Sequence, residues 1–268
     1  MAEICRVCHD PLTITLDPED LEDGDQQQQT VPDDLLLPCG CHFHWQCLLD
    51  QSTAVTTTLS CPSCNAFLSS NAAGASSSSS SSAALPLTTP MILTHYTNEG
   101  GVQPSLDIYP SLAEEAFLAA HPEARPARAF HTLASEGEVQ GMVELLTDAD
   151  GNADDEEEEE GARLSATQLL AWRDPLNGGQ TALHVALEAR QEEAVWVLLW
   201  LGSRASRDSF PEAVVQVAAA NGLPRRLEGT ADGEDVRFVR DERGRTAGDV
   251  CLELGEPWTR LVEGGLFI

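Results

Sequence analysis

The stretch Leu37–Leu48 reads L-P-C-G-C-H-F-H-W-Q-C-L and carries several side chains that can bind a metal ion. They are Cys39, Cys41, His42, His44 and Cys47. Two cysteine pairs flank the stretch, C-R-V-C at Cys5–Cys8 and C-P-S-C at Cys61–Cys64. A C-x2-C pair suits zinc because a tight turn directs both thiolates toward one tetrahedral ion.

The count of ligands predicts structural rather than catalytic zinc. The two flanking pairs and four ligands from the central stretch are enough for two closed four-ligand sites, so we expect two Zn²⁺ ions. A closed site leaves no coordination position for an activated water, and no other nucleophile–base set is recognisable in the sequence. In a reducing compartment, closely spaced cysteines bind metal more often than they form disulfides.

The charge of the chain excludes several classes of partner. Its 268 residues have a formal net charge of −29, which disfavours binding to nucleic acid and to anionic membrane surfaces. No apolar run reaches the roughly 18–20 residues that span a bilayer. The first residues, M-A-E-I-C-R, lack the layout of a signal peptide. We therefore expect a cytoplasmic or nuclear protein, or one found in both, whose partners are proteins.

Composition divides the first part of the chain into a cysteine-rich domain and a tether. Residues 1–68 hold the metal ligands and are interrupted by an acidic, Gln-rich segment, residues 16–34, which is typical of a solvated loop. Residues 69–105 are expected to form a Ser-rich flexible linker. Within it, M-I-L-T-H-Y-T from Met91 is the best candidate for a strand.

Residues 106–268 show the apolar spacing of helices, interrupted by an acidic insertion at 148–161. The segment Gly178–Ser203, G-G-Q-T-A-L-H-V-A-L-E-A-R-Q-E-E-A-V-W-V-L-L-W-L-G-S, closely resembles an ankyrin repeat. Less regular copies are found at Ala129–Leu146, Pro211–Leu223 and Asp241–Gly255. Such repeats bury their apolar faces only by stacking on neighbours, so the resemblance implies an all-α ankyrin-repeat solenoid of about four units.

Four side chains of the repeats invite a functional interpretation. In the ankyrin pattern, His184 hydrogen-bonds within and between turns, which favours a structural role over a catalytic one. Cys251 occupies an apolar helix position and is expected to be a buried thiol. Trp196 and Trp200 lie at i and i+4 on one expected helix. Two roles remain open for them, packing in the core and forming an exposed docking face for a partner.

The complete ligand spacing is C-x2-C, x30, C-x-C-x2-H-x2-C, x13, C-x2-C, and it resembles the RING finger. The usual centre of a two-histidine RING is L-P-C-x-H-x-F-H-x-x-C-L, and Cys41 stands here in place of the first histidine. The resulting order of four Cys, one His and three Cys also occurs in PHD fingers and in the RING-CH variant. PHD fingers have four residues between the central Cys and His, and RING-CH fingers have seven. This chain has two, as an ordinary RING does.

The resemblance implies a small α+β cross-brace fold that zinc stabilises. The first ion would be bound by Cys5, Cys8, His44 and Cys47. The second ion would be bound by Cys39, Cys41, Cys61 and Cys64. His42 is then not a ligand. In about 65 residues with no sizeable core, the zinc ions are expected to supply most of the folding energy.

RING domains recruit a ubiquitin-charged E2 enzyme and hold its thioester ready for attack, without providing the nucleophile. The resemblance therefore implies an E3 ubiquitin ligase that presents substrates bound by its ankyrin repeats. The E2 contacts carried over are Val7, Leu37, Leu48, Pro62 and Asn65. The alternative is a non-catalytic zinc-finger and ankyrin adaptor in a larger complex.

Two departures from the RING pattern bear on that choice. Many active RINGs carry Arg or Lys directly after the last cysteine, where this chain has Asn65. Many also have Trp four residues after the sixth ligand, where this chain has Gln51. Asn65 can donate hydrogen bonds but carries no charge, so the substitution favours weak or E2-selective activity.

All fifteen basic residues are Arg, and the sequence contains no Lys. Lysine is normally among the commonest residues. Two explanations remain open. One is the codon usage of a GC-rich genome, and the other is selection against ubiquitin acceptors on the surface of a ligase.

Overall fold

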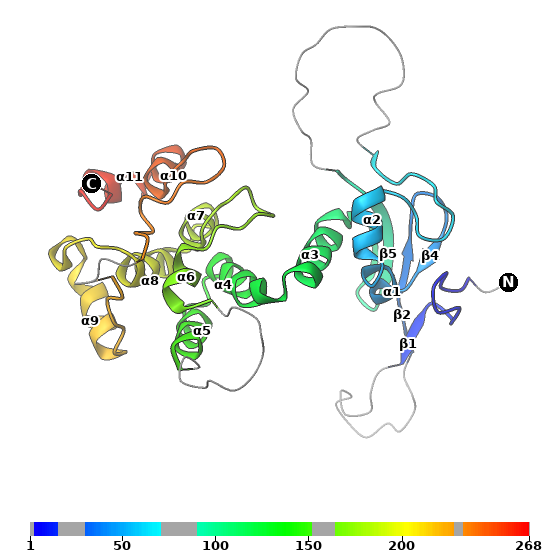
Figure 1. The fold of residues 1–268 in the computed structure, drawn as a ribbon, viewed down its shortest axis with the longest axis horizontal. Helices are drawn as coiled ribbons and strands as arrows, with labels where there is room; N and C mark the ends of the chain where they lie inside the picture. The colour runs from blue at the N-terminus through cyan, green and yellow to red at the C-terminus, as the bar shows by residue number, and fades with distance from the viewer. Residues whose placement is uncertain (1–2, 16–29, 71–89, 152–163, 228–232, 268) are drawn as a thin grey trace, which may run out of the picture. The chain divides into compact units, whose positions relative to one another are not determined.

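The computed structural model describes residues 3–15, 30–70, 90–151, 164–227 and 233–267. The chain divides into two compact units, Met1–Ala120 and His121–Ile268 (Figure 1). We call the first the cysteine unit and the second the helical unit. No helix in the described part of the chain is long and apolar enough to cross a membrane.

The cysteine unit is built on two small antiparallel sheets. In the first, β1 (Thr13–Thr15) pairs with β2 (Thr30–Pro32). The strands of the second, in spatial order, are β4 (His42–Phe43), β3 (Asp34–Leu36), β5 (Leu93–Asn98) and β6 (Gly101–Asp107). The pairing of β3 with β5 joins the cysteine-rich segment to a hairpin that lies far along the chain.

Three helices complete the cysteine unit: α1 (Trp45–Leu49), α2 (Ser52–Thr58) and α3 (Tyr109–Ala120). Helix α3 packs against α1 and α2. Ile92, Ile108 and Leu112 are fully buried in the same core as Phe43 and Leu48. Residues beyond 90 therefore supply part of the core that surrounds the cysteines.

The expectation of a flexible linker at 69–105 is wrong for residues 90–105, because these residues include β5 and most of β6. The strand predicted near Met91 is confirmed as Leu93–Asn98. The helical part begins later than the predicted residue 106, because α3 belongs to the cysteine unit. The physical reason is that Ile92, Ile108 and Leu112 complete the core formed by apolar side chains of the cysteine-rich segment, such as Leu35, Phe43 and Leu48. The serine run at 71–89 lies outside the described residues.

Both expected acidic segments are shorter than predicted. Residues 30–34 of the loop expected at 16–34 belong to β2, β3 and the residue between them, and residues 16–29 lie outside the described part. Residues 148–151 of the insertion expected at 148–161 form the end of a helix, and residues 152–163 are not described. Thr-Val-Pro and Asp-Leu-Leu bury alternate side chains, which is the pattern of a strand with one face on the core.

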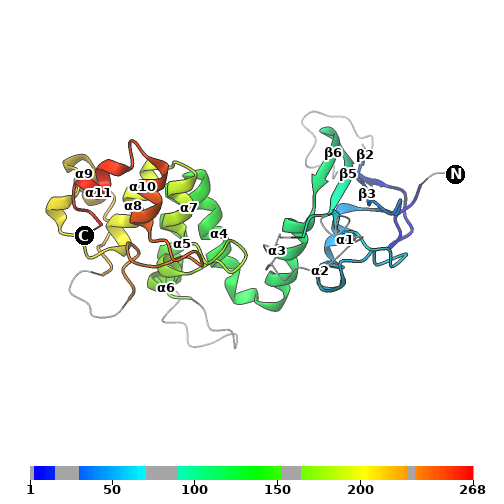
Figure 2. The same cartoon turned by 90° about the horizontal axis from the view of Figure 1, so that it is seen from above.

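The helical unit contains no strand among its described residues, so the prediction of an all-helical part is confirmed. Its helices are η3 (Pro122–Ala124), α4 (Arg125–Glu136), α5 (Val139–Gly151), α6 (Ala166–Ala171), α7 (Ala182–Glu188), α8 (Glu192–Gly202), η4 (Arg207–Ser209), α9 (Glu212–Ala220), α10 (Ala247–Leu254) and α11 (Thr259–Glu263). Neighbouring helices pair as α4–α5, α7–α8 and α10–α11. The first helices of these pairs, α4, α7 and α10, lie side by side (Figure 2).

Local sequence signals set the ends of these helices. Gly137 ends α4 with a left-handed φ of 79°, which allows the chain to turn directly into α5. Thr181 and Thr246 are the N-caps of α7 and α10, and each forms a capping box with the side chain three residues on, His184 and Asp249 respectively. Three of the four expected units are helix pairs, whereas Pro211–Leu223 provides the single helix α9. That these pairs are ankyrin repeats stays a prediction.

The core of the helical unit settles the assignment of Trp200. Trp200 is buried, and its indole N–H donates to the carbonyl oxygen of Leu223 over 3.1 Å, so it is a core residue. Trp196 is half-buried, and its ring centroid lies 6.3 Å from that of Phe210. Cys251 is buried as expected, and burial raises the pKa of its thiol to about 12.

The buried His131 on α4 makes the stability of the helical unit depend on pH. Burial lowers its pKa from 6.5 to about 3, and its ring packs edge-on against Trp172. Between these values the unfolded chain binds a proton that the folded chain does not, so stability falls as pH drops below 6.5. We expect a loss of about 2 kcal/mol between pH 7 and pH 5 from this group.

Urea unfolding of the full chain at pH 7 and pH 5 measures this loss. The His131→Phe variant keeps a flat apolar ring that does not titrate. It should therefore lose less stability than the parent chain over the same pH range. An equal loss in both proteins would rule out His131 as the source.

Candidate metal centres

The structure brings the eight expected ligands together in two clusters. The first contains Cys5, Cys8, His44 and Cys47. The second contains Cys39, Cys41, Cys61 and Cys64. Within each cluster, all four potential ligand atoms lie within 4.8 Å of one another. These are the two sets that the sequence resemblance implied.

In the first cluster, His44 is oriented as a metal ligand by a second contact. Its Nε2–H donates to the carbonyl oxygen of Pro11 over 2.8 Å, which leaves Nδ1 with a free lone pair. Nδ1 lies 3.3 Å from Sγ of Cys8 and 3.8 Å from Sγ of Cys47. The cluster therefore presents one imidazole nitrogen and three sulfur atoms toward a common centre, a donor set that suits zinc.

Backbone N–H groups favour the thiolate form in this cluster. Burial alone would raise the pKa of Cys5, but the N–H groups of His44 and Val7 each donate to its Sγ over 3.5 Å. Together with the Cys8 contacts they lower the pKa to about 7. Burial and the neighbouring Cys5 and Cys8 have the opposite effect on Cys47, whose pKa is raised to about 12.

The second cluster consists of cysteines alone. Burial, with the neighbouring Cys61 and Cys64, raises the pKa of Cys39 to about 12, although the backbone of Cys41 acts the other way. Four thiolates can share such a pocket only when a cation compensates their charge, and a bound Zn²⁺ does so. Both clusters therefore fit a structural zinc ion with four protein ligands, which would hold the loops together.

The two C-x2-C pairs fold into the same turn. The residue after the second cysteine has a left-handed backbone in each, with φ of 66° at His9 and 59° at Asn65. The N–H of His9 donates to the Cys5 carbonyl oxygen over 3.1 Å, and that of Asn65 donates to the Cys61 carbonyl oxygen over 2.9 Å. Asn and His adopt this conformation more readily than most residues. The left-handed backbone of the turn is thus a structural reason for asparagine at position 65.

The ligands of the two clusters alternate along the chain. Cys5 and Cys8 belong to the first cluster, the pair at Cys39 and Cys41 to the second, His44 and Cys47 to the first, and the last pair to the second. This alternation ties the beginning, the centre and the end of the segment to one another. An ion in the first cluster would link the segment before β3 to the segment after β4, and an ion in the second would link the β3–β4 loop to the segment after α2.

His42 lies outside both clusters. Its Nδ1 is 2.8 Å from Oδ1 of Asp34, and its Nε2 is 3.3 Å from Oε1 of Glu3. Both ring nitrogens are thus engaged with carboxylates rather than with sulfur.

The residues that position the helix carrying Cys47 were not predicted from the sequence. The buried Asp33 carboxylate accepts hydrogen bonds from the backbone N–H of Trp45, at the start of α1, over 3.2 and 3.3 Å. The Tyr96 hydroxyl, from β5, donates to the same carboxylate over 3.0 Å. Burial and the Asp33 charge raise the pKa of Tyr96 to about 12. The only sequence signal was an acidic residue among apolar neighbours, Val31 and Leu35.

The expected E2 contacts divide into exposed and buried residues. Val7 is 38 % exposed between the first cysteine pair, Pro62 is half-buried between the last pair, and Asn65 is exposed. Leu37 and Leu48 are 2 % and 0 % exposed and belong to the core, so the expectation that they contact a partner is wrong. The motif contains apolar residues at these positions because they fill the core between the two clusters.

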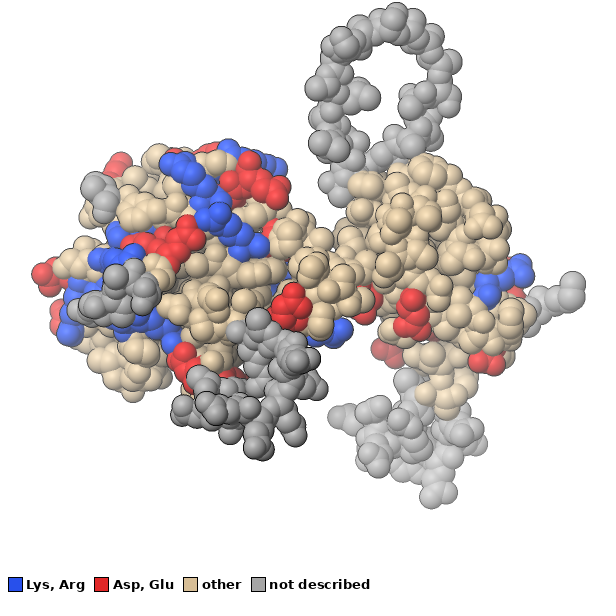
Figure 3. Space-filling model, in the orientation of Figure 1, with Lys and Arg blue, Asp and Glu red and all other residues tan. Residues whose placement is uncertain are grey.

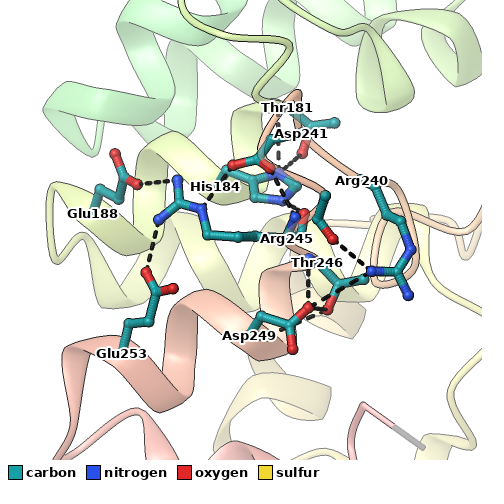
Figure 4. Close-up of polar contacts among 10 residues, drawn as sticks. Thr181, His184, Glu188, Arg240, Asp241, Arg245, Thr246, Asp249 and Glu253 are labelled. Atoms are coloured by element: carbon teal, nitrogen blue, oxygen red, sulfur yellow. Dashed lines mark hydrogen bonds and ion pairs between the residues drawn. The ribbon is translucent and has the colours of Figure 1, made fainter. Parts of the chain in front are cut away.

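His184 in the helical unit is part of a network that joins α7 to α10 (Figure 4). Its Nε2–H donates to the carbonyl oxygen of Arg245 over 3.2 Å, and its Nδ1 lies 2.8 Å from the Thr181 hydroxyl. Burial lowers the pKa of His184. Nδ1 thus bonds within the turn that begins α7 and Nε2 bonds across to the turn at Arg245, which confirms the structural role predicted for this histidine.

Comparison of the chain with protein-family models, curated proteins and solved structures finds no match.

Proposed function

We propose that the chain is a zinc-dependent E3 ubiquitin ligase of the RING type. The observation that carries the proposal is the alternation of two closed four-ligand clusters, with Val7 and Pro62 at the surface of the two matching turns. Apolar side chains on rigid zinc-held turns form a preorganised docking surface for a protein such as an E2 enzyme. In this proposal the cysteine unit positions the E2–ubiquitin thioester, and the stacked helix pairs act as ankyrin-like repeats that bind the substrate.

A matched pair of valines tests the docking surface. Val7→Ala removes two methyl groups from a zinc-held turn, whereas Val102→Ala makes the same change on β6, where Val102 is 64 % exposed. We expect Val7→Ala to reduce ubiquitin-chain formation about tenfold, because the loss of an apolar contact costs roughly 1–2 kcal/mol. Val102→Ala should retain the parent rate.

The assay is ubiquitin-chain formation by the full chain with E1, ATP and a panel of E2 enzymes, with zinc content measured for each variant. Unchanged zinc content shows that a variant is folded around its ions. Equal rates for Val7→Ala and the parent would contradict the assignment of this surface. Inactivity with every E2 would contradict the ligase.

The alternative is an adaptor that uses the same fold for assembly. The uncharged Asn65 and the burial of Leu37 and Leu48 favour it, because they leave a smaller contact surface for an E2 enzyme. Capture of a stable complex through the helical unit, together with inactivity across the panel, would support the adaptor.

A further inference from the structure

The cations of this chain are all arginine, so every blue atom in Figure 3 belongs to an arginine. The cysteine unit contains one of them, Arg6, and the helical unit contains the other fourteen. The contacts of these side chains separate positions that need a guanidinium from positions that need only a positive charge.

At some positions lysine could not replace arginine. The Arg245 guanidinium binds three carboxylates: Asp241 over 2.8 Å, Glu188 over 3.0 Å and Glu253 over 2.8 Å (Figure 4). The buried Arg237 contacts Asp235 through Nε and Nη2, over 3.0 and 2.8 Å. A lysine ammonium is a point charge and cannot reproduce this planar set of donors. Structure alone therefore explains arginine here.

At other positions structure gives arginine no advantage. Five exposed arginines make no side-chain hydrogen bond or ion pair with another residue of the described ranges. They are Arg6, Arg125, Arg190, Arg207 and Arg243. An exposed cation without a fixed partner is a position where lysine serves equally well for solubility. The absence of lysine therefore extends beyond the sites where a guanidinium is required.

We propose that lysine is excluded because an ε-amine on this surface would become a ubiquitin acceptor, so that the ligase modifies its substrate but not its own side chains. This inference rests on the proposed function. In the reaction that lysine would permit, the amine nitrogen attacks the thioester carbonyl carbon of the E2–ubiquitin conjugate. The N–C amide bond forms, the C–S bond breaks, the E2 cysteine leaves as a thiolate, and the amine loses a proton to solvent.

Arginine keeps the charge without this reactivity. The guanidinium stays protonated throughout the physiological pH range and has no free electron pair for attack. Arginine at an exposed position thus preserves the electrostatics of the surface and removes the acceptor.

Matched variants of the full chain test the inference. Gln103, exposed on β6, is changed to Lys or to Arg, which add the same charge but differ in the free amine. Arg207→Lys makes the corresponding change in the helical unit, with the parent chain as its control. Each protein is incubated with E1, ATP, ubiquitin and an active E2. Free ubiquitin chains and ubiquitin attached to the variant are measured separately, the latter by peptide mapping.

We expect every variant to form free chains at the parent rate and the Lys variants to carry about tenfold more ubiquitin on themselves than their Arg counterparts. Free chains with equal self-modification of Lys and Arg forms would overturn the inference and leave the ligase standing. Absence of free chains with every E2 would overturn the ligase and the inference together. Normal lysine usage in other proteins of the same organism would exclude codon usage as the explanation. A general absence of lysine from those proteins would overturn the proposal that lysine was selected against in this chain.

Discussion

Replacing His44 with Ala is expected to abolish tight zinc binding by the cysteine unit and to unfold it, whereas His42→Ala should leave two ions bound. His44 directs Nδ1 at the sulfur atoms of Cys8 and Cys47, while its Nε2–H is held by Pro11. The ring of His42 lies instead against Asp34 and Glu3. The two histidines are two residues apart and differ in the direction of their rings, so the same substitution tests the assignment of ligands directly.

The expected loss is large because metal binding and folding are coupled. Structural zinc contributes about 10–16 kcal/mol of binding free energy in small zinc-finger peptides, which equals or exceeds the whole stability of many domains. Because the ligands of the two clusters alternate along the chain, loss of the first ion also separates the segments that hold the second. The His44→Ala protein should therefore lose the cooperative unfolding of the cysteine unit, while the helical unit unfolds as before.

Zinc content, measured by atomic absorption after dialysis, distinguishes the two variants, and thermal unfolding shows which unit is affected. Cys251→Ala provides a second control, because this cysteine is buried in the helical unit, away from both clusters. It should keep two zinc ions while destabilising the helical unit alone. Loss of zinc from the His42→Ala protein, with zinc retained by His44→Ala, would reverse the assignment.

The grouping of the eight Cys and His side chains into two candidate metal sites could be predicted from the sequence, because the spacing of metal ligands is local and strict. A C-x2-C pair forms a turn of one kind, and the two residues between Cys41 and His44 fit one spacing class. Which apolar side chains of the domain are buried and which are exposed could not be predicted in the same way. Leu37 and Val7 are both apolar residues beside cysteines, yet the first is buried and the second is exposed.

The contribution of residues beyond 90 was missed for a different reason. The pairing of Leu35 with Tyr96 crosses about sixty residues, including the serine run, and no local signal specifies a contact at that separation. The strand itself was predicted, because the preference of such residues for strands is local. Its partner was not, and neither was the hydrogen bond between Tyr96 and Asp33 that links the strand to the start of α1.

A fragment that ends at residue 70 is therefore expected not to fold stably, even with zinc, whereas a fragment of residues 1–120 should fold and bind two ions. The shorter fragment lacks Ile92, Ile108 and Leu112, which are fully buried in the core of the cysteine unit. Burial of three such side chains contributes about 5–9 kcal/mol, comparable to the stability of a whole domain. It also leaves β3 as an open edge, which favours aggregation.

Zinc titration and two-dimensional NMR spectra of the two fragments measure this difference. We expect dispersed amide signals and two equivalents of tightly bound zinc for residues 1–120, and poorly dispersed signals for residues 1–70. Within the longer fragment, Ile92→Ala should cost about 2–5 kcal/mol because it opens a cavity, whereas Ile14→Ala, on the exposed face of β1, should cost far less. A dispersed spectrum and full zinc affinity for residues 1–70 would show that the ligand clusters alone determine the fold and that the β5–β6 hairpin and α3 are an attached layer.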